Sequence, residues 1–296
     1  MSNKIYPIGI QNFEKIRQDG YFYVDKTALM YQMVKTGSYY FLSRPRRFGK
    51  SLLISTLEAY FQGKKELFTG LMVEKLEKDW IEHPILHLDL NIEKYDALES
   101  LDNILDKSLT AWEKLYGAEP SERSFSLRFA GIIERACQKT GQRVVILVDE
   151  YDKPMLQAIG NEDLQKQFRD TLKPFYGALK TMDGCIKFAL LTGVTKFGKV
   201  SVFSDLNNLK DISMDERFVD ICGITEKEIH DNLEEELHQL AEKQKMSYEQ
   251  VCAELKECYD GYHFMEHTIG IYNPFCLLHT FDKMMFGSSW CETGPR

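Results

Sequence analysis

One segment, residues 38–61, constrains the fold of this chain more than any other. Aromatic and aliphatic residues over Ser38–Leu42 predict a strand, and apolar residues at helical spacing predict a helix over Lys50–Phe61. Between them the sequence reads Arg-Pro-Arg-Arg-Phe-Gly-Lys-Ser, which fits the phosphate-loop pattern G-x-x-x-x-G-K-[ST] except at its first position, where Arg44 replaces glycine. A strand before the loop and a helix after it are the context that phosphate binding requires.

This loop predicts a nucleotide site in which the backbone N–H groups at the start of the helix cradle phosphate oxygens. Gly49 lets the backbone approach the phosphates, Lys50 reaches the β- and γ-phosphates, and the Ser51 hydroxyl binds Mg²⁺. The predicted nucleotide-binding residues are Arg44, Pro45, Arg46, Arg47, Phe48, Gly49, Lys50, Ser51 and Leu52.

The alternative interpretation of this segment is a strand–turn–helix corner with an incidental lysine. Four positive charges fall within seven residues, at positions 44, 46, 47 and 50. They would repel one another without an anion nearby, which favours the phosphate site.

A second group of candidate residues follows the stretch Arg143–Val148, which is nearly all β-branched or aliphatic and in which Val144–Val148 form an unbroken apolar run. Such a run is typical of a strand buried on both faces, hence of a central parallel strand. We predict that Asp149, at its carboxyl end, binds Mg²⁺ and that Glu150 is the general base that polarises the attacking water. The alternative is a strand that ends at a solvated turn, where acidic residues are common.

The next predicted strand, Ile186–Leu191, ends at Thr192-Gly193. A polar residue at that place reads the γ-phosphate in ATPases with an additional strand, and Thr192 is our candidate. Thr195 and Lys196 are nearby substitutes. A simple Thr-Gly turn is the alternative.

The remainder of the first 224 residues alternates short apolar runs with amphipathic stretches, the pattern of an α/β sheet. We predict a strand over Ile85–Leu90, helices over Leu98–Tyr116 and Ser124–Lys139, and a short strand over Phe218–Cys222.

The character of the sequence changes near Gly223–Glu226, where we place a domain boundary between residues 1–224 and 225–296. Thr225 and Glu228 have the spacing of a capping box, which marks a helix start. An apolar stripe follows, and the segment is rich in acidic residues, as expected of a helical subdomain with a solvated face. The stripe consists of Ile229, Leu233, Leu237 and Leu240.

Composition excludes several classes of protein. The net charge of −8 argues against a broadly basic nucleic-acid-binding surface, so direct nucleic-acid binding is not expected of this chain alone. No apolar run is long enough to span a membrane, and Met1–Ile10 carries no apolar signal segment, so we expect a cytoplasmic protein with no membrane partner. Cysteine and histidine show no zinc-like spacing.

Taken together, these motifs resemble those of the bacterial AAA-ATPase-like family, over nearly the whole chain from Ile8 to Phe275. The stretches that carry the resemblance are Tyr23–Thr27, Phe41–Ser51, Val148–Pro154, Thr192–Lys196, Asn207–Leu209, Tyr259–Tyr262 and Tyr272–Phe275. In that family arginine at the first loop position is usual, so Arg44 does not argue against a working site.

The resemblance implies a P-loop NTPase fold of the additional-strand, catalytic-glutamate type, with a parallel sheet flanked by helices. It further implies that residues 225–296 form a helical lid over the nucleotide, and that Ile8–Thr27, within the N-terminal segment 1–37, flanks adenine. Many members carry a C-terminal PD-(D/E)xK nuclease-like domain. The sequence stops at Arg296 without one, as a naturally short form, a truncated gene or a fragment would, so the resemblance carries no nuclease activity over.

We therefore expect a Mg²⁺-dependent ATPase with Glu150, Lys50 and Thr192 as catalytic residues and Ser51 and Asp149 as metal ligands. ATP is favoured over GTP by the resemblance and because no Asn-Lys-x-Asp motif occurs. An arginine finger would come from Arg46, Arg47, Arg169 or Arg217, or from a neighbouring subunit of a homo-oligomer. The alternative is a nucleotide-gated switch module with little hydrolysis that regulates a protein effector such as a nuclease.

Overall fold

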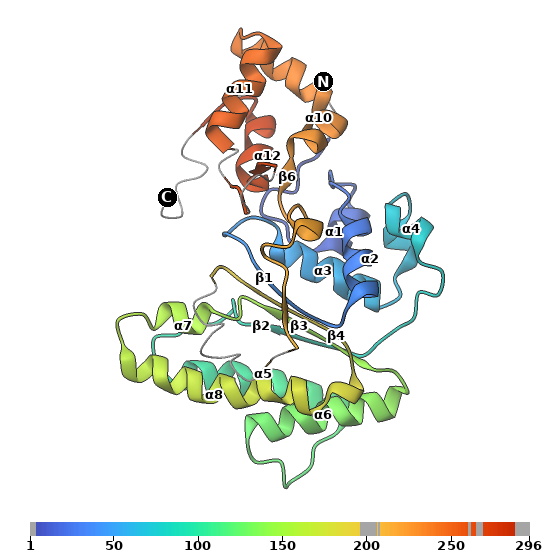
Figure 1. Ribbon diagram of the computed structural model, residues 1–296, viewed down its shortest axis with the longest axis vertical. Coiled ribbons are helices and arrows are strands. Elements are labelled where there is room, and N and C mark those ends of the chain that lie inside the picture. The colour runs from blue at the N-terminus through green and yellow to red at the C-terminus, as the bar shows by residue number, and fades with distance from the viewer. Residues whose placement is uncertain (1–3, 196–205, 207, 260–261, 265–268, 288–296) are drawn as a thin grey trace.

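The computed structural model describes residues 4–195, 206, 208–259, 262–264 and 269–287. It has an α/β core, and a smaller helical subdomain is stacked on one side of that core, shown in orange and red in Figure 1. Lys196, Asn207 and residues 260–261, which belong to motifs singled out in the sequence, lie outside the described residues.

The core is built on a parallel five-stranded sheet in the order β2-β3-β4-β1-β5. Its strands are β1 (Tyr39–Ser43), β2 (Ile85–Asp89), β3 (Val144–Asp149), β4 (Ile186–Gly193) and β5 (Lys210–Asp211). Because β4 lies between β1 and β3, the loop after β1 and the turn after β3 flank the end of β4 at one edge of the sheet.

Alternate side chains of β3 enter two separate hydrophobic clusters. Val144, Ile146 and Val148 pack into the cluster on one face of the sheet. Val145 and Leu147 pack into the cluster on the other. This confirms the prediction of an inner parallel strand buried on both faces, since an alternating polar pattern would leave one face in water.

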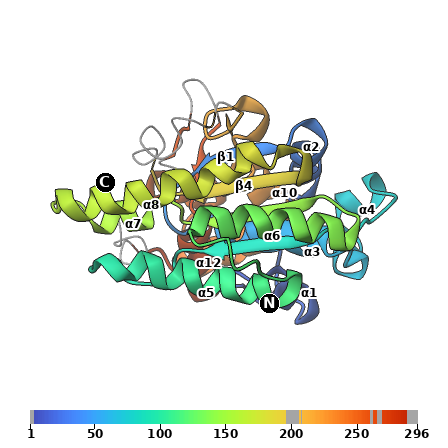
Figure 2. The ribbon, with the colours of Figure 1, turned by 90° about the horizontal axis from the view of Figure 1, so that it is seen from below.

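Helices cover both faces of the sheet (Figures 1 and 2). One layer contains α1 (Phe13–Gln18), α2 (Thr27–Thr36), α3 (Lys50–Phe61) and α4 (Met72–Leu76), with a 3-10 turn over Lys65–Phe68. The other contains α5 (Leu98–Tyr116), α6 (Phe125–Thr140), α7 (Lys153–Gln157) and α8 (Glu162–Thr181), with a 3-10 turn over Asp183–Cys185. Figure 2 shows α5, α6 and α8 as this second layer.

The predicted helices over Lys50–Phe61 and Leu98–Tyr116 are confirmed to the residue. The third predicted helix is also present, as α6, with the Ser124 hydroxyl capping its N-terminus. Each of the four strands predicted over 38–42, 85–90, 143–148 and 186–191 is present, with ends displaced by two residues at most.

The predicted strand over Phe218–Cys222 is wrong. A 3-10 turn, Glu216–Phe218, and further turns occupy this segment, although Phe218, Ile221 and Cys222 are all buried in the core. The backbone carbonyls of Phe218 and Val219 accept hydrogen bonds from the Arg44 guanidinium instead of from a neighbouring strand. A short apolar run signals burial, and burial alone does not select a strand.

The helical subdomain comprises α10 (Glu226–Gln244), α11 (Tyr248–Tyr259) and α12 (Pro274–Lys283). A two-stranded antiparallel pair, β6 (Ile224–Thr225) and β7 (Ile271–Tyr272), joins it to the core. The predicted capping box at Thr225 is present, and all four residues of the predicted stripe are buried in the subdomain's own hydrophobic cluster.

The N-terminal segment connects the two parts of the molecule. Phe13 belongs to the core cluster beneath α1 and α3. Four other side chains pack against the helical cluster, namely Tyr6, Ile8, Phe22 and Val24. The Lys4 ammonium is 2.8 Å from the fully buried Glu236 carboxylate on α10. The first residues of the chain are therefore as much part of the helical subdomain as of the core.

The capping box at the start of α10 gives a stability prediction. Thr225→Ala removes the hydroxyl that accepts from the Glu228 N–H, and we expect it to lower the free energy of unfolding by about 1 kcal/mol. Thr225→Ser keeps the hydroxyl and serves as the control, with a loss well below that of alanine. Urea unfolding measures both, and equal losses for the two variants would contradict the role of the cap.

Candidate active site

Three loops meet at the carboxyl edge of the sheet. They follow β1, β3 and β4, whose register places Ser43 beside Gly193 and Val148 beside Leu191. Parallel strands bring their carboxyl ends to the same edge, where open α/β sheets bind ligands. The predicted residues of the phosphate loop, the acid pair and Thr192 are thereby brought together.

Lys50 is buried at the start of α3, with 4% of its surface exposed. Its Nζ donates to the backbone carbonyls of Arg44 at 3.0 Å and Pro45 at 3.2 Å. The same Nζ lies 3.1 Å from the Glu150 carboxylate. Gly49, directly before the helix, has φ of +93°, a left-handed conformation that glycine adopts without a steric penalty.

Glu150 occupies an unusual backbone conformation for a residue with a side chain, with φ of +55°. Burial raises the pKa of its carboxyl above the ordinary value, Lys50 opposes that shift, and the neighbouring charges of Asp149 and Asp152 add to it. A carboxylate with a raised pKa is a stronger base than a solvated one, which suits the role predicted for this residue.

Asp149 and Thr192 contact each other directly. The Thr192 hydroxyl donates to Asp149 Oδ1 at 2.6 Å, and both residues are buried. The two residues were predicted from different strands, and β4 lies next to β3 in the sheet. Asp149 is thereby held at the end of β3 by the neighbouring strand.

The chemistry of these side chains would fit a magnesium ion. Ser51 lies in the first turn of α3 and Asp149 ends β3, and hydroxyl and carboxylate oxygens are suitable Mg²⁺ ligands. Within the described part of the chain, no group of three or more His, Cys, Asp or Glu residues could hold a metal by itself. Magnesium sites of this kind use one or two protein ligands together with substrate phosphates.

Arg44 has a different environment from the rest of the loop. Its guanidinium is 1% exposed and donates to the carbonyls of Ser43, Ser213, Phe218 and Val219. It also stacks on Phe264, 3.9 Å from the ring centroid. Burial lowers its pKa. The guanidinium therefore braces the loop from behind through its two terminal nitrogens, while its buried Nε has no hydrogen-bond partner among the described residues.

The four arginines considered as fingers have distinct settings. Arg46 and Arg47 are exposed on the loop, and the Arg47 guanidinium lies over the Phe275 ring at 4.1 Å. Arg217 pairs with Asp215. Arg169 lies on α8, and its buried Nε has no hydrogen-bond partner among the described residues.

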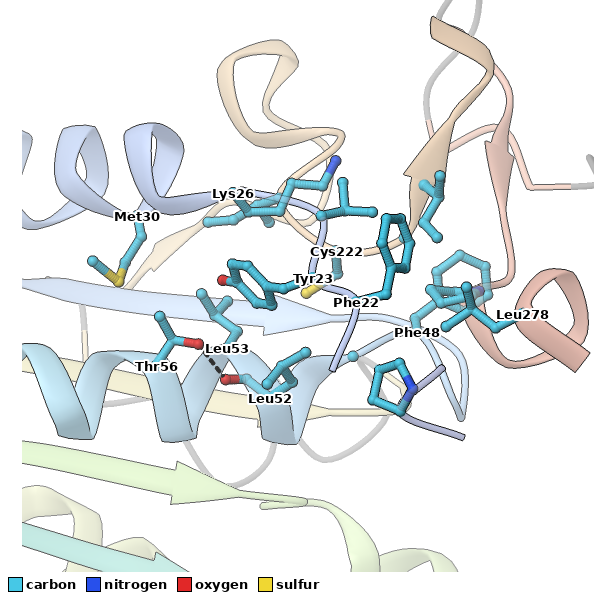
Figure 3. A pocket seen from close by; sticks show the side chains of 17 residues that line it. Phe22, Tyr23, Lys26, Met30, Phe48, Leu52, Leu53, Thr56, Cys222 and Leu278 are labelled. Atoms are coloured by element: carbon cyan, nitrogen blue, oxygen red, sulfur yellow. Dashed lines mark hydrogen bonds between the residues drawn. The ribbon is translucent and has the colours of Figure 1, made fainter. Parts of the chain in front are cut away.

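An apolar cavity opens beside the phosphate loop (Figure 3). Its empty volume is about 680 Å³ including the open mouth. The N-terminal segment, the loop, α3, the turn before β6 and α12 all contribute to its wall. Representative lining residues are Phe22, Tyr23, Phe48, Leu52, Cys222 and Leu278.

Few polar groups face this cavity. Burial raises the pKa of the Tyr23 hydroxyl, which keeps it neutral, and Thr56 lies next to it. The Lys26 ammonium is bound to the Glu228 carboxylate at 2.5 Å, which links the N-terminal segment to the start of α10. Of the N-terminal segment Ile8–Thr27, four residues line this cavity next to the loop, namely Phe22, Tyr23, Val24 and Lys26. Cys222 and Leu278 were not predicted, because only the tertiary fold brings them there.

The sheet, its strand order and the loop define an α/β protein whose architecture is compatible with the P-loop NTPase fold. Residues 7–203 match the AAA-ATPase-like family, described as "Predicted AAA-ATPase". The chain therefore belongs to this family, as the motifs predicted, and the family indicates a nucleotide-binding ATPase.

A curated relative from Azotobacter chroococcum mcd 1, "Uncharacterized protein in vnfD 5'region", is 41% identical over 296 residues. The alignment covers 99% of this chain and 55% of the relative, so the chain spans about half the length of that protein. No solved structure matches the chain. None of the helices in the described ranges is both long and apolar enough to cross a membrane.

Gly193 permits the close packing of the turns after β3 and β4. A Cβ at this position would lie 2.5 Å from the Tyr151 ring and 2.7 Å from Asp152 Oδ1. We expect Gly193→Ala to lower the free energy of unfolding by about 1–3 kcal/mol, as overpacking does.

Gly177→Ala is the matched control, because a Cβ there, within α8, meets nothing within 4 Å. It should raise stability by about 0.5–1 kcal/mol through helix propensity. Chemical unfolding of the two variants tests the packing, which is disproved if Gly193→Ala is as stable as wild type.

Proposed function

We propose that this chain binds ATP with Mg²⁺ and hydrolyses it to ADP and phosphate. The observation that carries the proposal is the placement of Lys50, Glu150, Asp149 and Thr192 at one edge of the sheet, beside a glycine-containing loop that opens a helix. An ammonium, a potential base and a carboxylate held by a hydroxyl are the groups that phosphoryl transfer to water needs.

The 3.1 Å contact between Lys50 and Glu150 suggests how binding prepares the reaction. A triphosphate in the loop offers Lys50 phosphate oxygens in place of the Glu150 carboxylate. Glu150 then accepts a proton from water as the water oxygen bonds to the γ-phosphorus. The bond from that phosphorus to the β–γ bridging oxygen breaks, and ADP leaves. Mg²⁺, held by Ser51 and Asp149, would neutralise charge on the phosphates.

The strand order supports the additional-strand, catalytic-glutamate type of this fold. β4 lies between the strand that precedes the loop and the strand that ends in the acid pair. Its terminal Thr192 hydroxyl therefore reaches Asp149, and we propose that it also contacts the γ-phosphate. We propose residues 44–52 as the nucleotide-binding residues, with Arg44 acting through the shape of the loop.

The cavity next to the loop is the proposed site of the adenine base. Gly49 and Leu52 belong both to the cavity wall and to the segment that would hold phosphates. A flat, largely apolar base suits a wall made of Phe22, Leu278 and their neighbours. The N-terminal segment would then flank adenine from one side and α12 from the other.

Contacts of the loop with the helical subdomain support a lid, residues 225–296, that responds to the nucleotide. Phe48 packs edge-to-face on Tyr262 and Phe264, with ring centroids 4.6 and 5.6 Å away. Arg47 stacks on Phe275 at the start of α12. Movement of the loop on binding phosphate would move these aromatic contacts, which couples turnover to the position of the lid.

One observation favours a second candidate function, a nucleotide-gated switch that regulates a protein effector. Lys50 and Glu150 are bound to each other. In the proposed reaction Lys50 binds phosphate and Glu150 accepts a proton, so this ion pair must break before hydrolysis. Such a pair suits a chain that turns over slowly until a partner, or a second copy bringing an arginine, completes the site. Because the chain spans about half of its relative, the activity of any longer protein is also a proposal.

Phosphate release and nucleotide binding together test the proposed function. We expect wild type to hydrolyse Mg²⁺–ATP, and Glu150→Gln to bind ATP with turnover reduced about 10²- to 10⁴-fold, since the base is lost while the loop keeps Lys50. Lys50→Ala should fail to bind at micromolar ATP, because the loop loses its buried ammonium.

Lys166→Ala, at an exposed pair on α8, is the control and should match wild type in both assays. Binding without hydrolysis in wild type would favour the switch function. Binding that is unchanged in Lys50→Ala would refute the site itself.

The cavity proposed for adenine can be tested separately from the phosphate loop. Leu278→Trp fills the cavity from α12, and we expect it to weaken ATP binding at least tenfold, about 1.4 kcal/mol, while binding of inorganic triphosphate is unchanged. Leu278→Met conserves volume and should bind ATP like wild type. Calorimetric titration of each variant gives both affinities. Unaltered ATP binding by Leu278→Trp would place the base elsewhere.

A further inference from the structure

Asp152 lies in the turn between β3 and α7, two residues after Glu150. We infer that Asp152 is a positioning residue, which locks the turn after β3 to the end of β4 and so holds Glu150 and Thr192 in place around the reacting phosphate. This inference rests on the proposed function, and it adds a residue for which that proposal has no role.

The Asp152 side chain is completely buried and accepts hydrogen bonds from the residues that follow the carboxyl end of β4. Its Oδ2 accepts from the Thr195 N–H at 2.7 Å and from the Thr195 hydroxyl at 2.9 Å. The Val194 N–H lies 3.1 and 3.2 Å from the two carboxylate oxygens. Three donors of one short segment thus converge on a single carboxylate.

Burying a carboxylate is unfavourable unless donors replace the water that it loses. Here two of the three donors are backbone N–H groups, which belong to the chain just past β4. A carboxylate has only acceptors, so it can serve all three donors at once. An asparagine in the same place would direct its side-chain NH₂ group, which is a donor, toward these N–H donors.

A second set of contacts ties Glu150 to this clamp. The Tyr151 N–H donates to the Thr192 carbonyl at 2.9 Å, and the Tyr151 hydroxyl donates to the Thr195 carbonyl at 3.0 Å. Glu150, just before Tyr151, has the left-handed φ of +55°. A strained conformation of this kind persists only where the surroundings hold it. The clamp formed by Tyr151, Asp152, Thr192, Val194 and Thr195 provides that hold.

Gly193 permits this clamp because it has no side chain. Its missing Cβ is the space into which the Tyr151 ring and Asp152 Oδ1 approach. The clamp thus fixes the residues on both sides of Gly193, with Thr192 on one side and Val194 on the other. The Thr192 hydroxyl holds Asp149. Loosening the clamp would therefore shift the proposed metal ligand, Asp149, and the proposed base, Glu150, together.

The test compares kcat with nucleotide affinity in the full chain. We expect Asp152→Asn to lower kcat for Mg²⁺–ATP at least tenfold while the Kd for metal-free ATP changes by less than threefold, because the phosphate loop lies on β1 and α3, outside the clamp. Asp170→Asn, an exposed acid on α8, is the matched control and should leave both values unchanged. A merely fold-stabilising role would leave kcat of the folded fraction at the wild-type value.

A second variant and amide hydrogen exchange test the clamp independently of Asp152→Asn kinetics. Thr195→Val removes the hydroxyl donor and keeps the backbone N–H donors. It should therefore lower kcat as Asp152→Asn does, and it tests the clamp even if Asp152→Asn does not fold. In Asp152→Asn, amide hydrogen exchange should be at least tenfold faster than in wild type, both in the peptide around Glu150 and in the peptide around Thr195.

Exchange that changes only around Thr195, or a kcat in Asp152→Asn equal to wild type, would overturn the inference. Wild type without any turnover would instead refute the proposed function, and the exchange result would still decide whether the clamp holds Glu150.

Discussion

A buried ammonium group is the feature on which the rest of this structure depends. Lys50 lies at the start of α3, held by two loop carbonyls and by the Glu150 carboxylate. A buried charge is tolerated only when it is paired and hydrogen-bonded, so the loop, the helix start and the turn after β3 must all keep their places around it. In the proposed function, the same ammonium binds phosphate oxygens of the nucleotide in place of the Glu150 carboxylate.

The order of the strands allows this arrangement. With β4 between β1 and β3, the loop and the acid pair face each other across one strand, and Thr192 at its end touches Asp149. All neighbours in the sheet are parallel, so their carboxyl ends form one edge. The two helical layers bury both faces of the inner strands, and the carboxyl edge with its loops is where open α/β sheets bind ligands.

Aromatic rings of the helical subdomain contact the loop. Phe48 contacts Tyr262 and Phe264, while Arg47 lies on Phe275. The N-terminal segment adds a second connection, with Lys26 bound to Glu228 and its apolar side chains packed on the helical cluster. The cavity beside the loop is enclosed by all of these parts. Its shape consequently depends on how the subdomain sits on the core.

The sequence by itself determined the local elements and the residue types of the candidate site. The helix over Lys50–Phe61, the β3 run and the Thr225 cap follow from periodicity, burial and capping, all encoded within a few residues. Only the tertiary structure decided which distant groups meet. It turned Phe218–Cys222 into turns, placed Arg44 among carbonyls and gave Asp152 its three donors. Those outcomes depend on partners more than 40 residues away, and a hydrogen bond to a distant carbonyl leaves no periodic trace in the sequence.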